Sequence, residues 1–448
     1  MNPVVVPAGN SSWLGRLRLA MSNAHMTDVL AETWSWARNN NLNVTGCQLQ
    51  RVFPRREGEF LIEYNVDLSG ADGQSQQLLL AELIDGDLAV QRASVLQSLR
   101  KSRRQQLPKH QDDDCVDILP DPGLLVRLPG LDQRLPGLGQ LKDTDLLSKS
   151  LAGVLACEPD QIRDASSEIL GHRLGKRCIA RCRYHRLGDN QEQSMIVKLY
   201  KVRGNRGTTV FSVMKALWEN GWNEESDTRV PRPLLWCQDS NSLWMEDVKA
   251  TPLPELPANR QQNAVNGAGR ALARLHRTQI DVSGGYTNDD EICLLDGWVQ
   301  LIWTVFPDRA ERLSAVLSQV RSTLRRCQST PTALVHRDFY EKQILVEQNT
   351  TTLIDFDTLC QSDPALDIGN FLAHLRLLRL QGFGGFFGAE QAFLDGYGNV
   401  GVDFGRRIDG YTAATLLRLA CLYSFWPRWS QVSEPLLEGI VNDLRAAE

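Results

Sequence analysis

A pair of short apolar strands flanked by acidic side chains constrains the fold of this chain more than any other feature. The run HRDFYEKQILV places Asp338 and Gln343 in a loop that leads into the first strand. The run TLIDFD forms the second strand and ends it with Asp355 and Asp357. Asp338 and Asp355 are 17 positions apart. That spacing allows a hairpin that folds the second carboxylate back beside the first.

These side chains suit phosphoryl transfer from ATP. One carboxylate aligns the accepting hydroxyl, while an amide oxygen and a second carboxylate hold Mg²⁺ against the phosphates. The sequence therefore predicts a nucleotide-dependent transferase whose active site is built around this hairpin.

The same residues resemble the kinase superfamily, and within it the aminoglycoside phosphotransferase and choline kinase branch. HRD, four intervening residues and Gln343 come first, then IDFD, then DPALDIGN at 363–370. This is the order of that branch's catalytic and metal segments. Each motif alone is weak, but three in the right order and spacing are specific. The resemblance covers about residues 165–430 and implies a kinase-like fold that binds ATP and Mg²⁺.

The resemblance implies a role for each residue of these motifs. Asp338 is the catalytic acid, Gln343 and Asp355 are metal ligands, and Asp357 is a further metal ligand or supports one. Asp367 is a structural acid that holds the backbone of the catalytic loop. Most of the family has Asn in place of the Gln, which is one methylene longer. Maltokinase-type enzymes are similar to this chain in carrying Gln there and in having an N-terminal extension.

Upstream residues fit the same hypothesis. Lys198 interrupts an otherwise apolar strand, where a charge is costly unless it has an anionic partner. By resemblance, this lysine contacts the α- and β-phosphates of ATP. Residues 171–186 include six Lys or Arg and no acid, and a turn between Gly171 and Gly175 suits the approach of a triphosphate. An ordinary exposed basic hairpin is the alternative.

Two further contacts follow from the resemblance. The run MEDV resembles the hinge between kinase lobes, where the carbonyl of Glu246 and the N–H of Val248 would bond the adenine edge. An ordinary edge strand is equally compatible with this tetrapeptide. On the helix after Lys198 the earlier positions are apolar, and Glu219, 21 positions after the lysine, is the candidate for its ion-pair partner.

The chain divides into an N-terminal extension or cap domain (1–141), a kinase-like N-lobe (142–248) and a kinase-like C-lobe (249–448). The expected fold is α+β, with a small antiparallel β lobe containing one helix, a large mostly helical lobe and an additional N-terminal α/β domain. Strands are predicted at 60–68, 77–84, 124–128, 178–184, 195–200 and 243–246, with a strand-rich stretch at 333–358. Helices are predicted at 20–38, 208–220, 264–278, 298–326, 370–380 and 411–426.

The first block ends in two distinctive segments. The charges from Arg100 to Arg104 and from Asp112 to Asp114 are typical of a solvated loop. A connector rich in proline and glycine (120–139) then stiffens the link to the second block. We therefore expect the first block to be a cap or rigid extension of the small lobe.

The first block also resembles the second in outline. Residues 51–84 and 173–200 both read as a basic cluster, a glycine, an apolar strand with a tyrosine, a polar loop and a further apolar strand. Two hairpins can agree this well by chance. If the similarity is real, Glu82 stands where the later copy has Lys198, and the first block is a scaffold without that lysine.

Composition excludes several classes of protein. Lys and Arg number 49 against 54 Asp and Glu, which excludes a protein that coats nucleic acid generally. No run of about 18 apolar residues predicts a membrane span, and the first 13 residues lack the pattern of a secretory signal. The ten cysteines are scattered, which favours reduced thiols in a cytoplasmic protein.

The expected partner is a small-molecule acceptor such as a sugar, an amino alcohol or an aminoglycoside, with no nucleic acid and no membrane; the sequence predicts no oligomeric state. Only five residues separate Asp357 from Asp363, too few for a long segment that binds a peptide. Helical and aromatic-rich parts at 296–308, 382–397 and 423–429 are candidates for acceptor contact, although such aromatics more often form core.

Three alternatives stay open. A kinase acting on a protein is one, since Arg337 gives the protein-kinase form of the catalytic triplet. A catalytically weak or silent nucleotide-binding module would account for Gln343, but the chain retains Lys198 and both central acids. A glycosyltransferase built on the Asp-Phe-Asp sequence at 355–357 would leave the upstream loop unexplained.

Overall fold

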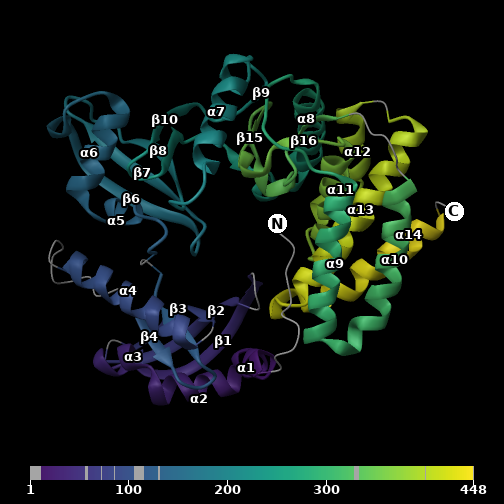
Figure 1. The fold of residues 1–448 in the computed structure, drawn as a ribbon. Helices are drawn as coiled ribbons and strands as arrows, with labels where there is room; N and C mark the ends of the chain where they lie inside the picture. The colour runs from purple at the N-terminus through teal and green to yellow at the C-terminus, as the bar shows by residue number, and fades with distance from the viewer. Residues whose placement is uncertain are drawn as a thin grey trace.

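The computed structural model shows three parts along the chain (Figure 1). An N-terminal domain lies beneath a small β-rich lobe, and a large helical lobe stands beside both. The expected α+β fold, with a small antiparallel β lobe, a mostly helical lobe and an additional N-terminal α/β domain, is confirmed, although the small lobe contains more than the one helix expected. The structure describes residues 12–55, 59–71, 73–84, 86–104, 116–129, 132–326, 332–398 and 400–446.

The N-terminal domain is an antiparallel sheet with helices packed against it. Its strands, which lie in the order β1-β2-β3-β5-β4 across the sheet, are β1 (Asn43–Pro54), β2 (Phe60–Gly70), β3 (Gly73–Leu83), β4 (Val116–Leu119) and β5 (Leu124–Arg127). Its helices are α1 (Ser12–Ala20), α2 (Asn23–Thr33), α3 (Ser35–Asn39) and α4 (Gly86–Arg104). The three strands predicted in this block are confirmed.

Two predictions for this domain were wrong in part. The single helix expected at 20–38 is broken, because Ser22 caps a new helix by accepting a hydrogen bond from the N–H of His25 and Trp34 has an extended backbone. The basic half of the charged segment is the end of α4 rather than a loop. Its acidic half, Asp112–Asp114, lies outside the described residues.

The small lobe is a second antiparallel sheet with helices on both faces. Its strands, in the order β6-β7-β8-β11-β10, are β6 (Ile162–Arg173), β7 (Arg177–Arg186), β8 (Gln193–Tyr200), β10 (Pro233–Cys237) and β11 (Ser242–Glu246). Its helices are α5 (Leu138–Lys142), α6 (Thr144–Leu155) and α7 (Arg206–Glu219). Leu147 and Leu151 of α6 pack with Val197 on one face, and Val210 of α7 packs in a cluster with Leu243 on the other.

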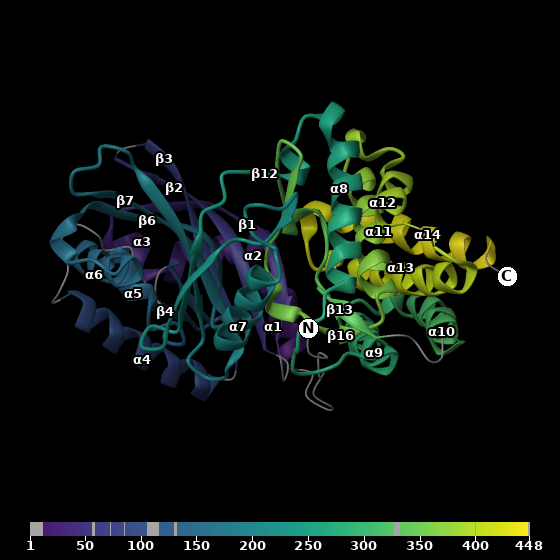
Figure 2. The same ribbon diagram turned by 90° about the horizontal axis from the view of Figure 1, so that it is seen from above.

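The two sheets share one topology. In both, three consecutive antiparallel strands are followed by a helix. The fifth strand then pairs with the third, and the fourth strand lies at the outer edge. Glu82 of β3 and Lys198 of β8 each lie on the third strand, between the second and the fifth. The structure therefore supports the internal similarity suggested by the sequence. Seen from above, the two sheets overlap on the side away from the large lobe (Figure 2).

The buried acid of the N-terminal sheet has its own ion pairs. Glu82 is 1% exposed and pairs with Arg92 of α4 and Arg127 of β5. The sequence predicts a corresponding connection in the small lobe, from Lys198 on the third strand to Glu219 on the following helix. The N-terminal domain has the same connection with the charges reversed.

The large lobe is mostly helical, with short strands on the side of the small lobe. Its helices are α8 (Ala258–Arg277), α9 (Asn288–Val305), α10 (Ala310–Arg326), α11 (Ala365–Leu380), α12 (Ala389–Tyr397), α13 (Val402–Tyr423) and α14 (Ser433–Ala446). Its strands are β9 (Thr228–Arg229), β12 (Thr251–Pro252), β13 (Ala333–Val335), β14 (Ile344–Glu347), β15 (Thr350–Leu353) and β16 (Cys360–Ser362).

One helix prediction in this lobe was wrong. The helix expected at 298–326 is divided into α9 and α10, because Phe306 leaves the helical conformation and Pro307 cannot continue the hydrogen-bond ladder. Within the described part of the chain, no helix combines the length and the hydropathy needed to cross a bilayer.

We predict that the buried ion pairs of Glu82 stabilise the N-terminal domain. Glu82→Gln leaves Arg92 and Arg127 buried beside a neutral amide, so the free energy of unfolding should fall by about 3–5 kcal/mol. Chemical denaturation followed by circular dichroism measures this. Glu219→Gln removes an acid whose side chain is 64% exposed and should change stability little. Equal stability of both variants would contradict the prediction.

Candidate active site

A β-hairpin brings the two acidic segments together, as the sequence predicts. Ile344 of β14 pairs with Leu353 of β15, and the N–H of Ile354 donates to the carbonyl of Gln343 at 3.0 Å. The loop before β14 and the residues after β15 therefore lie at the same end of the hairpin. This end faces the small lobe, since Asp355 forms ion pairs with strands β7 and β8.

The backbone of the catalytic loop is held by a buried acid on α11. Asp367 is fully buried and accepts hydrogen bonds from the N–H groups of His336 and Arg337, each at 2.6 Å. The Nε2 of His276 lies 3.2 Å from the same carboxylate. His336 also bonds the carbonyl of Ile354 at 2.9 Å, which joins the loop to the hairpin. These contacts fix the position from which Asp338 projects.

Two residues of the site adopt left-handed backbone conformations. Arg337 has φ of 65° and Asp355 has φ of 66°, a region in which side chains other than glycine store strain. Each lies next to hydrogen bonds that hold it in place. Strain of this kind is common at functional sites, where surrounding structure over-determines the backbone.

Four charged side chains form the centre of the site. The Nζ of Lys198 lies 2.7 Å from Asp355 and 2.6 Å from Asp357. Arg177, the first residue of β7, lies 3.0 Å from Asp355 and 2.5 Å from Asp357. The hydroxyl of Tyr200 donates to Asp357 at 2.8 Å. We call Lys198, Arg177, Asp355 and Asp357 the charge cluster.

The ionisation of the cluster reflects these contacts. Burial by itself would raise the pKa of Asp355, but the charges of Lys198 and Arg177 outweigh it and hold that pKa well below its usual range. The pKa of Asp357 is lowered by the same two cations against the opposing effect of burial and of Asp355. For Arg177, burial lowers the pKa, and the two carboxylates more than reverse the effect. Asp355, Asp357 and Arg177 are therefore charged at neutral pH.

The metal ligands predicted from the sequence are the two cluster carboxylates and the side chain of Gln343. Carboxylate and amide oxygens are the ligands that Mg²⁺ prefers, so these residues fit the ion in chemistry. Among the described residues no group of three His, Cys, Asp or Glu side chains is arranged to hold a metal. Any metal here would thus depend on the Gln and on phosphate oxygens besides the two carboxylates.

Asp338 differs from the other acids of the site. Its side chain is half-buried and forms no hydrogen bond or ion pair within the described part of the chain. Its charge acts on Arg177 and on the hydroxyl of Tyr340, so it lies near both. The carboxylate is therefore free to accept a hydrogen bond from a ligand.

The predicted phosphate turn is attached to the N-terminal domain. Gly175 has φ of 68°, and its N–H donates to Asp132 of the connector at 2.5 Å. Arg55, at the end of β1, donates to the carbonyl of Leu174 at 2.7 Å. The side chain of Leu174 is 1% exposed and packs with Leu61 and other apolar residues of the N-terminal sheet. This turn is thus held from outside the small lobe.

The N-terminal domain also contacts the large lobe. The N–H of Val52 donates to the carbonyl of Phe425 at 3.2 Å. Phe53 packs edge-on against Trp426 with 5.9 Å between ring centroids, and Arg51 lies over the same indole. The domain therefore bridges the two lobes, through the turn on one side and the end of α13 on the other.

The structure does not bring Glu219 to Lys198. Glu219 lies at the exposed end of α7 and pairs with Lys215 on the same helix at 3.8 Å. Lys198 takes its anionic partners from the large lobe instead. Gly171 lies within β6 opposite Ile179, beside a bulge, and not in the turn itself.

The predicted hinge is at the end of β11. The side chain of Glu246 pairs with Arg229 and accepts from the N–H of Arg232 at 3.0 Å. The carbonyl of Val248 accepts from Ala250, and in the described residues its N–H has no hydrogen-bond partner. That N–H is available to a ligand, and its contact with adenine stays a prediction.

Sequence reasoning missed three residues of the site. Arg177 was counted among six basic residues, but nothing in its local sequence separates it from the others. Asp132 and Arg55 lie outside the region of family resemblance.

We predict that Leu174 is the anchor of the turn. Leu174→Ala empties a buried site, so the free energy of unfolding should fall by about 2–4 kcal/mol. Amide exchange at Gly175 should accelerate, while exchange in β14 should not. Leu187→Ala is the matched control, because that leucine also follows a strand of this sheet but is 53% exposed. Unchanged exchange at Gly175 in the Leu174 variant would show that the turn is held by its own lobe.

Comparisons with known proteins were made for the whole chain. Residues 174–400, just over half of it, match the model of the phosphotransferase enzyme family. No curated protein matches the sequence. A choline/ethanolamine kinase family protein from Mesorhizobium loti is 14% identical, with a TM-score of 0.46 over 67% of this chain and 94% of that chain.

Two further solved structures are similar at the same level. A thermostable mutant of an aminoglycoside phosphotransferase in complex with ADP and hygromycin B is 14% identical, with a TM-score of 0.48 over 67% of this chain and 98% of that chain. An ethanolamine kinase from Plasmodium vivax is 14% identical, with a TM-score of 0.39 over 63% of this chain and 78% of that chain.

Proposed function

Because the chain belongs to the phosphotransferase enzyme family, we propose that it transfers the γ-phosphoryl group of ATP to a hydroxyl of a small molecule, with Mg²⁺ as the metal. The acceptor class is a sugar, an amino alcohol or an aminoglycoside. One observation carries the proposal: the charge cluster and the unpaired Asp338 meet at one end of the hairpin, where the charge of Asp338 acts on Arg177. This arrangement supplies cations for phosphates, carboxylates for a metal and a free acid for a hydroxyl.

The cluster is suited to exchange its partners when substrate binds. Lys198 and Arg177 now neutralise Asp355 and Asp357, and all four are largely buried. Bound Mg²⁺ would supply positive charge between the carboxylates and the phosphates. The two cations would then be released to hold phosphate oxygens. Each charged group would thus keep a partner of opposite charge. Such pre-placed charges stabilise developing charge without reorganisation.

Asp338 would align the acceptor. Its loop is fixed by Asp367, so the carboxylate can accept a hydrogen bond from the acceptor hydroxyl in a set orientation. A hydroxyl held in this way loses its proton more readily as the oxygen attacks, and positioning supplies much of the rate. The unpaired N–H of Val248 and the carbonyl of Glu246 would fix the adenine at the other end of the nucleotide.

We predict distinct defects for the two central acids. Asp338→Asn keeps size but removes the charge that orients and accepts the proton, so turnover should fall on the order of 10²-fold or more with little change in nucleotide affinity. Asp355→Asn removes a charged metal ligand, so it should weaken Mg·ATP binding as well as turnover. Calorimetric titration of Mg·ATP and steady-state kinetics measure both quantities.

The control for this pair is Asp281→Asn, an exposed acid outside the site, which should behave like the wild type. Full activity of the Asp338 variant, or equal loss of nucleotide affinity in both site variants, would contradict the assignment. Equal loss of affinity would favour a nucleotide-binding module without catalysis, and full activity of the Asp338 variant would mean that another group orients the acceptor.

We also predict that ATP consumption depends on a small acceptor. The full chain should consume ATP in the presence of one member of a panel of sugars, amino alcohols and aminoglycosides. The assay should be repeated with Asp338→Asn to exclude contaminating activity. Labelling of a protein by γ-labelled ATP, without turnover of any small molecule, would overturn the choice of acceptor.

A further inference from the structure

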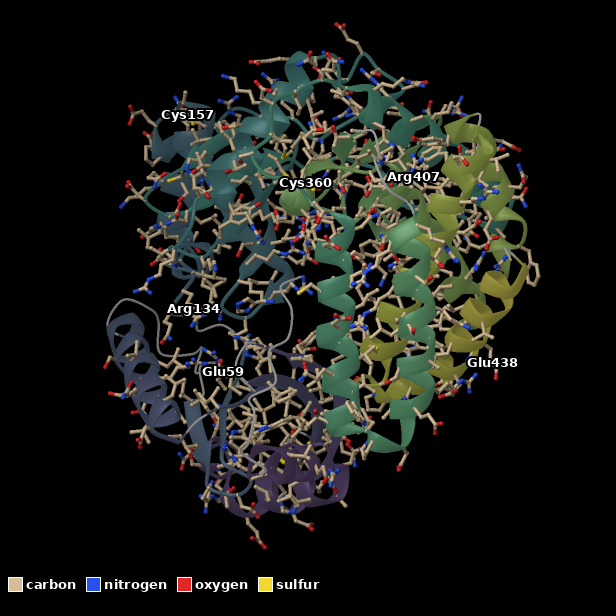
Figure 3. All side chains as sticks on the ribbon, turned by 45° about the vertical axis from the view of Figure 1, so that its right-hand side comes forward. Glu59, Arg134, Cys157, Cys360, Arg407 and Glu438 are labelled. Carbon is tan, nitrogen blue, oxygen red and sulfur yellow. The ribbon has the colours of Figure 1, made fainter. Side chains whose placement is uncertain are left out.

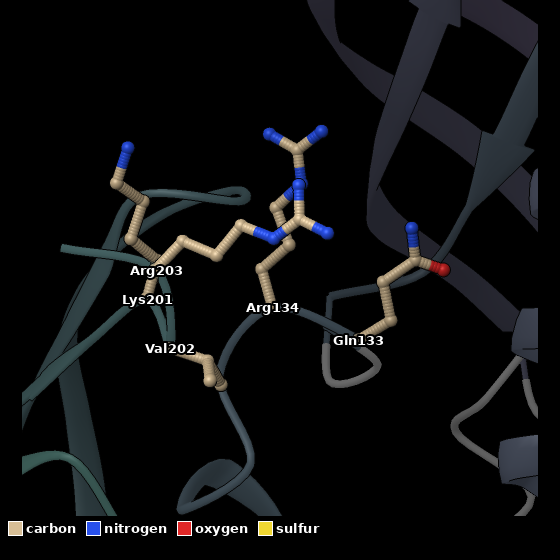
Figure 4. A pocket seen from close by; sticks show the side chains of 5 residues that line it. All are labelled: Gln133, Arg134, Lys201, Val202 and Arg203. Atoms are coloured by element: carbon tan, nitrogen blue, oxygen red, sulfur yellow. The ribbon is translucent and has the colours of Figure 1, made fainter.

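A cationic pocket lies where the connector meets the small lobe. It has a volume of about 490 Å³, and Figure 4 shows the side chains that line it. Two segments line it, the connector and the loop after β8, and they are joined by a hydrogen bond from the N–H of Val202 to the carbonyl of Arg134 at 3.2 Å. The lining residues are Gln133, Arg134, Lys201, Val202 and Arg203.

The charges of this pocket are uncompensated. Arg134, Lys201 and Arg203 form no ion pair within the described part of the chain, and no acid is among the lining residues. In Figure 4 the side chain of Arg203 extends toward that of Arg134, and the ammonium group of Lys201 lies apart from both guanidinium groups. The side-chain oxygen of Gln133 also lacks a hydrogen-bond partner. Like charges gathered around a hollow favour an anion, and guanidinium groups match phosphate geometry.

A neighbouring lysine lies in the same positive electrostatic potential. Lys176 directly follows Gly175, and the position of a Cβ on Gly175 would lie 3.4 Å from the Cδ of Arg134. The side chain of Lys176 reaches solvent. Desolvation at the junction and the charges of the surrounding guanidinium groups nevertheless lower its pKa to about 8. Those groups are Arg173, Arg55, Arg177 and Arg206. Positive charge is thus in excess around the turn.

The pocket is separate from the place of the nucleotide phosphates. Arg177 and Lys198, the cations assigned to those phosphates, contact Asp355 and Asp357 of the large lobe. The pocket cations instead lie beyond the end of β8 and on the connector, which leads to the N-terminal domain. Figure 3 shows Arg134 and Glu59 on opposite sides of that junction.

We propose that this pocket is a second anion site, which binds the phosphate group of a phosphorylated small molecule. Arg134 and Arg203 would hold the phosphate oxygens, with Lys201 adding charge and Gln133 accepting from a hydroxyl of the same molecule. Binding there would also steady the turn, because Asp132, which holds the N–H of Gly175, is two residues before Arg134. The proposal goes beyond the proposed function and does not require Asp338 to catalyse transfer.

The test uses the full chain and glucose 6-phosphate as the probe, titrated calorimetrically with and without saturating Mg·AMP-PNP. The wild type should bind one equivalent under both conditions, and plain glucose should not bind in its place. In the double variant R134Q/R203Q the affinity should fall at least about tenfold, because two charge-assisted contacts are lost. The double variant R18Q/R163Q removes the same charge from exposed, unpaired positions and should bind as the wild type does.

Several results would overturn the site: no binding of the probe, equal affinity in the two double variants, or displacement of the probe by Mg·AMP-PNP. Failure of Mg·AMP-PNP to bind to any of these proteins would contradict the proposed function and not the anion site.

Discussion

The candidate active site depends on ion pairs that join the two lobes. Asp355 and Asp357 belong to the large lobe, whereas Arg177 and Lys198 belong to the small lobe, and all four are largely removed from water. Buried charges are tolerated only when paired, and loss of one partner leaves the other charge buried without compensation. The cluster therefore fixes the approach of the lobes, and it keeps in one place the groups that we propose for metal and phosphate.

The N-terminal domain is a second sheet of the same topology that lacks this arrangement. Its third strand carries Glu82 instead of a lysine, and Glu82 pairs within its own domain with Arg92 and Arg127. Among the described residues, the ion-pair partners of this acid are both arginines, in contrast to the carboxylates that face Lys198 in the small lobe. Its apolar surface is used instead to bury Leu174 of the turn.

Sequence patterns predicted the parts of the site that are local. The hairpin and its acids lie within some twenty residues, and Lys198 was visible as a charge in an apolar strand. The pairing of Arg177 with acids about 180 positions later depends on lobe packing, which no local pattern records. The assignment of Glu219 failed for the same reason, because the partner of Lys198 came from the other lobe. The buried residues of α4 recur at helical spacing, but its basic end resembled a solvated loop, so no helix was predicted there.

The bridge formed by the N-terminal domain limits how the lobes can move. Opening the cleft by rotation of the small lobe would separate the charge cluster, and it would also pull Leu174 and Gly175 against their contacts with the N-terminal sheet and Asp132. The same domain is bonded to the large lobe through Val52 and Phe425. Any opening must therefore break one of these two attachments or carry the domain with one lobe. The attachment at the turn includes a buried leucine and two polar contacts. We therefore expect the weaker contact with the end of α13 to break first.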